Sequence, residues 1–122
     1  MMPGMSYALA VWEGQKPESN ESAAQMFEEL MDRWQEGADG VPPTPNIAAY
    51  VEALLDRWPD ITTEEGESSP WADGPLINNA MGPIVYFSLI WSMAEEASTF
   101  AADLAASQGL ACFDPQAEVL RP

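Results

Sequence analysis

The sequence predicts an α+β fold: a single domain over residues 1–122, with helices packed on one face of a mixed β-sheet. Three observations predict it. Residues 6–12 and 84–91 are apolar on both alternating faces, which is typical of central strands. Apolar stripes with helical spacing separate these two segments. The resulting order fits a ferredoxin-like β-α-(α)-β-β-α-β sandwich, with the second helix as an insertion.

In this plan we expect the strands over residues 6–12 and 84–91 to be central and parallel. A ferredoxin-like sheet leaves one face bare, but both faces of these strands are apolar. The second helix, the long loop over residues 60–82 or another chain must therefore cover the second face. Candidates for this cover are Trp12, Trp58 and Trp71. Either all five Trp residues belong to one core, or some form an exposed interface, where Trp is enriched.

The first two helices are predicted from their start signals and stripes. The first covers about residues 20–36, with Ser19 or Asn20 as its cap. The second begins at Thr44 and Pro45, a capping side chain followed by Pro at the first helical position. It ends just past Trp58, because Pro59 stops it.

The third helix begins from a capping box formed by Ser92 and Glu95, and Gly109 ends it in the left-handed conformation. Short strands are predicted over residues 110–113 and 119–120, with a turn at Asp114-Pro115-Gln116 between them. The preceding irregular region, residues 60–82, contains at most a short strand near residues 71–77. It is longer than ordinary connections, which indicates a functional or mobile segment.

The composition excludes several functional classes. The 122 residues include 20 Asp and Glu against 4 Lys and Arg, and no His, for a net charge of −16. Nothing neutralises phosphates, so we expect no nucleic-acid partner, and the charge also repels anionic membranes. A histidine base or histidine metal site is impossible. With 47% hydrophobic residues, the chain is not an acidic disordered tail.

The same composition bears on location and on cysteine chemistry. The apolar run of residues 84–91 is too short to cross a bilayer, and residues 1–5 do not form a secretory signal. We therefore expect a soluble, cytoplasmic protein. The single cysteine, Cys112, excludes an intramolecular disulfide. Its apolar neighbours indicate a small buried residue and not a nucleophile.

Motifs for catalysis and for cofactors are absent from the sequence. There is no Gly-x-Ser-x-Gly elbow, no phosphate-binding glycine loop, and one lysine, Lys16, for any Ser-Lys pair. The run Glu64-Glu65-Gly66-Glu67 lacks the spacing of a calcium loop, so we assign no metal site. We expect a protein that is not an enzyme and needs no cofactor.

The charge is spread evenly between the two halves of the chain but is densest over residues 60–73. An acidic surface speeds encounter with a basic protein partner. We therefore predict a partner-binding loop with Trp71 as its aromatic anchor. The predicted partner-binding residues are Asp60, Glu64, Glu65, Glu67, Trp71 and Asp73.

Three segments also carry a resemblance. Residues 5–14 read MSYALAVWEG, residues 109–122 read GLACFDPQAEVLRP, and Ser69-Pro70-Trp71 lies between them. Together they resemble small bacterial α+β proteins that begin SYxLxVW and end with GLxxxDPQ, some of which look like immunity proteins of toxin systems. The resemblance covers the order of elements over most of the chain. It implies an immunity or inhibitor role, in which carboxylates occupy a site built for phosphates on a basic toxin.

Two other functions stay open. The first is a small-molecule-binding protein or enzyme whose carboxylate-lined pocket lies between the sheet and residues 60–82, with Asn78 or Asn79 in it. The second is a homodimer that pairs its sheets, with the acidity serving solubility alone. A deep pocket with converging carboxylates would favour the first, and self-association at micromolar concentration would favour the second.

Overall fold

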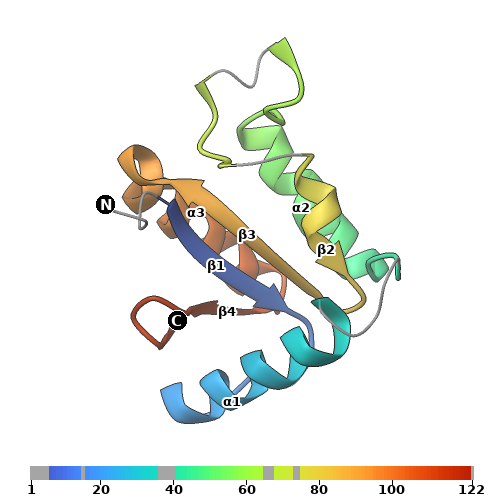
Figure 1. Ribbon diagram of the computed structural model, residues 1–122, viewed down its shortest axis with the longest axis vertical. Helices are drawn as coiled ribbons and strands as arrows, with labels where there is room; N and C mark the ends of the chain where they lie inside the picture. The colour runs from blue at the N-terminus through green and yellow to red at the C-terminus, as the bar shows by residue number, and fades with distance from the viewer. Residues whose placement is uncertain (1–5, 15, 36–40, 65–67, 73–74, 122) are drawn as a thin grey trace.

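The computed structural model describes residues 6–14, 16–35, 41–64, 68–72 and 75–121. It is an α+β fold with three α-helices and a five-stranded antiparallel sheet of order β2-β3-β1-β4-β5 (Figure 1). The strands are β1 (Ser6–Trp12), β2 (Ala80–Met81), β3 (Ile84–Ile90), β4 (Ala111–Asp114) and β5 (Val119–Arg121). The α-helices are α1 (Asn20–Leu30), α2 (Pro45–Arg57) and α3 (Ala94–Ser107). Shorter turns are π-helical η1 (Met31–Gln35) and 3-10 helical η3 (Leu76–Asn79) and η4 (Trp91–Met93).

The two long strands are central neighbours, as expected, but their predicted parallel pairing is wrong. β1 runs antiparallel to β3 from the pair Ser6–Ile90 to the pair Trp12–Ile84. All four strand pairs are antiparallel, so the sheet is not mixed. β3 lies between β2 and β1 and is antiparallel to both, so β1 and β2 run in the same direction. The turn at Gly82 and Pro83 reverses the chain between β2 and β3.

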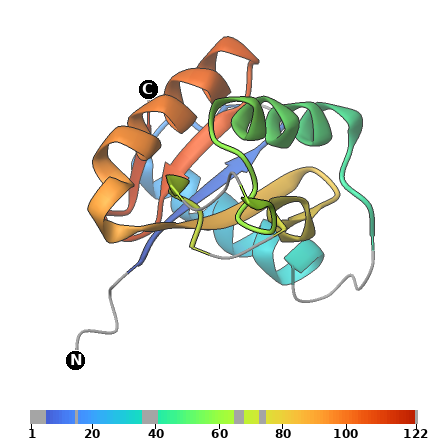
Figure 2. The same ribbon diagram turned by 90° about the horizontal axis from the view of Figure 1, so that it is seen from above.

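The helices cover both faces of the sheet, where helices on one face were expected. The second face is covered by α1, and not by α2, the loop or another chain as predicted. Leu9 and Val11 of β1 belong to a core with α2 and α3, whereas Ala10 and Trp12 point the other way and pack with α1. Figure 2 shows α2 and α3 side by side on the same side of the sheet. Strands that are apolar on both faces require such double cover. The ferredoxin-like plan, with its helices on one face, is therefore not confirmed.

Two of the three predicted helix starts are confirmed. The Ser19 side chain accepts a hydrogen bond from the Ser22 N–H at the start of α1. Thr44 caps α2 in the same way, with Pro45 as the first helical residue.

The predicted start of α3 is wrong. The helix begins at Ala94 without a side-chain cap, because Ser92 lies inside the 3-10 turn η4 and does not have the extended backbone of a cap. The predicted end is confirmed, since Gly109 has a φ of +74°. In the described segments, no helix is both long and apolar enough to span a membrane.

Candidate functional site

Asp60, the first residue of the predicted binding loop, is held by the fold. Its carboxylate accepts hydrogen bonds from the Leu76 N–H at 2.8 Å and from the Thr62 N–H and hydroxyl at 3.0 Å each. Partial burial acts to raise the pKa of Asp60, but these three hydrogen bonds outweigh it and lower the pKa. Asp60 therefore ties the loop after α2 to η3, which is an internal structural role.

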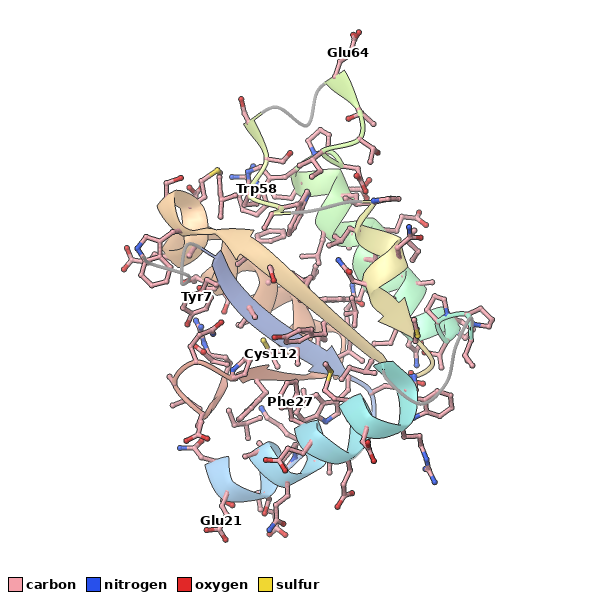
Figure 3. The ribbon with its side chains drawn as sticks, viewed as in Figure 1. Tyr7, Glu21, Phe27, Trp58, Glu64 and Cys112 are labelled. Carbon is pink, nitrogen blue, oxygen red and sulfur yellow. The ribbon has the colours of Figure 1, made fainter. Side chains whose placement is uncertain are left out.

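Glu64 is the one acid of the predicted loop that the structure describes as exposed. Figure 3 shows its side chain at the tip of the loop, pointing away from the rest of the molecule. Glu65, Glu67 and Asp73 lie outside the described residues. The placement of Glu64 leaves its carboxylate accessible to a partner.

Trp71, the predicted aromatic anchor, lies in the core. It is 2% exposed and packs edge-on against Trp58 and Phe87, with ring centroids 6.0 and 6.1 Å away. Its indole N–H donates to the Trp58 carbonyl at 3.0 Å. Backbone hydrogen bonds on either side of it join the segment to β3, so the expected short strand here is reduced to one bridge between Trp71 and Leu89. In this conformation Trp71 supports the loop from within.

The two ends of the chain that carry the resemblance meet in one hydrogen-bond network. The Tyr7 hydroxyl donates to the carboxylate of Asp114, which is buried. The Gln116 side chain accepts from the Ala8 N–H and donates to the Ala8 carbonyl at 2.8 Å and to Asp114 at 2.6 Å. The turn after β4 is thereby fixed beside β1. The network thus joins residues 6–12 and 114–116, which are more than 100 residues apart in the sequence.

Beside this network lies an open groove of about 460 Å³. Trp91 is 58% exposed, and its ring lies 6.0 Å from that of Tyr7. Glu95 and Arg121 bring charges of both signs to the groove, which is completed by Ala94, Ser98 and Thr99. The sequence pattern assigned Trp91 to the apolar strand, so its exposure was not foreseen. The polar residues after Trp91 mark the end of the strand, and they could have indicated that Trp91 lies at the surface.

A second accessible surface follows α1 and η1. Open grooves of about 540 and 350 Å³ lie along it and share Glu29 and Asp32. Their other lining residues are Phe27, Glu28 and Met31 for the larger groove, and Met26, Leu30 and Arg33 for the smaller. This surface combines carboxylates with methionine and aromatic side chains.

Nucleophilic and metal chemistry find little support in the described part of the chain. Cys112 is buried as predicted, and burial raises the pKa of its thiol to about 12, so it is protonated at neutral pH. No group of three or more His, Cys, Asp or Glu residues there could hold a metal ion. None of these three grooves is lined by residues 60–82, where a small-molecule pocket was predicted.

Comparison of the chain with models of protein families, with curated proteins and with solved structures finds no match.

Proposed function

We propose that this chain is a non-enzymatic, cytoplasmic binding protein that engages a basic protein partner, with an immunity or inhibitor role as the most concrete form. One observation carries the proposal: most carboxylates of the described residues are exposed, and few of them are paired with a cation. Among the described residues a single ion pair is found, between Arg57 and Glu96 at 3.4 Å, and both of its side chains are about half exposed. With a net charge of −16, the surface attracts cationic proteins over a long range.

The mechanism is electrostatic. Carboxylates on this surface would occupy the positions that phosphates take on a basic nuclease, and so exclude its substrate. Complementary charge raises the association rate and makes it fall with ionic strength. Because exposed ion pairs contribute little each, the partner must meet several carboxylates together.

We propose two roles for the residues of the predicted loop, contact with the partner and support of the loop. Glu64, together with Glu65, Glu67 and Asp73, is proposed to contact the partner. Asp60 and Trp71 are proposed to hold the loop, because their polar groups are already bound within the chain.

The experiment measures association rates with a panel of basic nucleases and with acidic proteins of similar size, from about 20 to 500 mM salt. We expect binding to one or more basic members only, with a rate that falls steeply with salt. Reversing Glu64, Glu65 and Glu67 to Lys should slow association and flatten its salt dependence. Binding that is indifferent to salt, or absent across the basic panel at low salt, would overturn the proposal.

The groove beside Trp91 favours a second candidate, a small-molecule-binding protein. Two aromatic rings and charges of both signs are typical of sites that orient a small polar ligand. A screen of small zwitterionic and aromatic compounds by tryptophan fluorescence tests it. Saturable binding that is lost in Trp91→Ala supports this candidate. A fluorescence change that persists in the variant would place the ligand elsewhere.

A further inference from the structure

Helix α1 and the π-helical turn η1 are only half covered by the rest of the molecule. Ala23 is the single fully buried residue of α1, whereas α2 has four and α3 has six. The other members of its apolar stripe are partly exposed, namely Met26, Phe27, Leu30, Met31 and Trp34. The face that α1 and η1 present therefore leaves parts of these apolar side chains accessible beside its charged residues.

The inner side of this stripe is firmly anchored. The Phe27 ring lies 5.7 Å from Tyr86 and 5.4 Å from Phe113, centroid to centroid, and Figure 3 shows it pointing from α1 toward the sheet. Trp34 lies directly against the backbone of Gly82. The helix is thus fixed in position, and its flanks form a preorganised surface.

The outer side of the same surface is acidic. Glu28, Glu29 and Asp32 are exposed and line the two grooves, with Arg33 as the base beside them. Methionine side chains adapt to the shape of a partner, and here Met26 and Met31 lie on opposite flanks of the three carboxylates. A ligand for this surface must therefore be both apolar and cationic.

We propose that this surface, the α1–η1 face (Met26–Arg33), docks a cationic amphipathic helix of a partner protein. The inference rests on the proposed function and names a second contact surface for the basic partner, at the opposite end of the molecule from Glu64 (Figure 3). The partner's apolar side chains would enter the grooves beside Met26 and Met31, and its Lys and Arg side chains would meet Glu28, Glu29 and Asp32. Helix-in-groove recognition of this kind uses apolar anchors at helical spacing.

Charge also argues against a second copy of this chain as the occupant. Two molecules of net charge −16 repel each other, and two α1–η1 faces would bring like carboxylates together. The two faces of the sheet are not free to pair with a second copy, because helices of the same chain cover them. A cationic amphipathic helix would bury the apolar part of the surface and would pair with its carboxylates.

The probe is a synthetic helical peptide in which leucines form one stripe and lysines the other. A peptide of the same composition with scrambled order is its control, because it has equal charge but no apolar stripe. Labelled methionine methyl groups report the contact by NMR in the wild-type protein. We expect shifts at Met26 and Met31, and none at Met93, which belongs to another part of the fold.

Two charge-reversal variants supply a matched comparison. Glu28→Lys/Glu29→Lys/Asp32→Lys alters the α1–η1 face, and Glu52→Lys/Asp56→Lys/Asp103→Lys alters exposed positions on α2 and α3. Both change the net charge from −16 to −10, two units for each reversal. We expect the first to weaken binding of the helical peptide about tenfold, since three exposed pairs contribute modestly each, and the second about threefold or less.

The outcomes separate this inference from the proposed function. Equal affinity for the helical and scrambled peptides, equal losses in the two variants, or a methyl shift at Met93 as large as those at Met26 and Met31 would overturn the docking surface while leaving charge-driven binding intact. If neither peptide binds at low salt, both this inference and the proposed function fail. Selective methyl shifts in the wild type support the inference even where a variant folds poorly.

Discussion

Two equally buried tryptophans differ in one hydrogen bond. Trp12 and Trp71 are 0% and 2% exposed. The Trp71 indole N–H donates to the Trp58 carbonyl, whereas the indole N–H of Trp12 has no hydrogen-bond partner within the described structure. An unpaired buried donor costs free energy, so the nitrogen of Trp12 destabilises the fold while that of Trp71 stabilises it.

We therefore predict that Trp71→Phe lowers the free energy of unfolding by about 1 to 2 kcal/mol more than Trp12→Phe. Both variants lose similar apolar area, so their difference isolates the indole hydrogen bond. Urea unfolding of the two variants beside the wild type measures it. Equal losses, or a larger loss for Trp12→Phe, would mean that the Trp12 nitrogen has a partner such as a buried water.

Asp60 connects the acidic loop to the core, and its effect on stability should depend on pH. Its folded pKa is lowered, so its contribution is present above the unfolded pKa of about 3.9 and is lost as the pH falls through the lower folded value. Asp60→Ala should cost about 1 to 2 kcal/mol at pH 7, and this cost should shrink near pH 3. Urea unfolding at the two pH values measures the change.

Asp56→Ala is the control for this prediction, since Asp56 is exposed on α2. It should change the free energy of unfolding by less than about 0.5 kcal/mol at either pH. A cost of Asp60→Ala that stays constant down to pH 3 would contradict the role given to the charged carboxylate.

The candidate site was only partly predictable from the sequence. Density of charge along the sequence singled out residues 60–73, but it cannot show which acids already have partners in the chain. Asp60 bonds to Leu76, sixteen residues away, and Trp71 is held by Trp58. These contacts depend on the path of the loop, which no local pattern encodes.

At the scale of elements, Gly82 joins three parts of the fold. Its φ of +53° makes the turn between β2 and β3, and the backbone around it bonds to Pro42 and Thr44 ahead of α2. A Cβ atom added there would lie 2.5 Å from the Trp34 ring of η1. Gly109 has a similar positive φ of +74°, but nothing lies within 4 Å of its added Cβ.

The two glycines therefore form a matched pair. Gly109→Ala should cost about 1 kcal/mol, the strain of a left-handed backbone with a side chain. Gly82→Ala should cost at least about 1 kcal/mol more, because Trp34 must also move in a packed region. Thermal and urea unfolding compare them. A Gly82→Ala variant no less stable than Gly109→Ala would show that Trp34 does not pack tightly on this turn.

Elements with strong local signals were predictable, and those set by distant partners were not. Thr44 and Pro45 mark α2 within two residues, and segments that are apolar on both faces mark β1 and β3. The direction of β3 depends on its pairing with both β1 and β2, and α3 begins late because η4 intervenes. The residues of η1 continue the apolar helical stripe of α1. Their sequence therefore does not reveal that η1 is π-helical.

At the scale of the whole molecule, the charge that favours a cationic partner also opposes folding. The chain carries −16 on 122 residues, and its folded form brings these charges closer together than the unfolded chain does. Salt screens this repulsion, since the Debye length falls from about 30 Å at 0.01 M to about 10 Å at 0.1 M. The unbound protein should therefore be stabilised by salt, whereas its complex with a partner should be weakened.

We predict that raising sodium chloride from about 10 to 500 mM increases the free energy of unfolding by about 1 kcal/mol or more. The variant Glu52→Lys/Asp56→Lys/Asp103→Lys, with a net charge of −10, should gain less over the same range. Urea unfolding at several salt concentrations gives, for each of the two proteins, the slope of the free energy of unfolding against salt concentration. Equal slopes would mean that salt acts through hydration or specific ion binding, because charge repulsion must scale with the net charge. A smaller slope in the variant would identify self-repulsion as the free-energy term that a cationic partner relieves on binding.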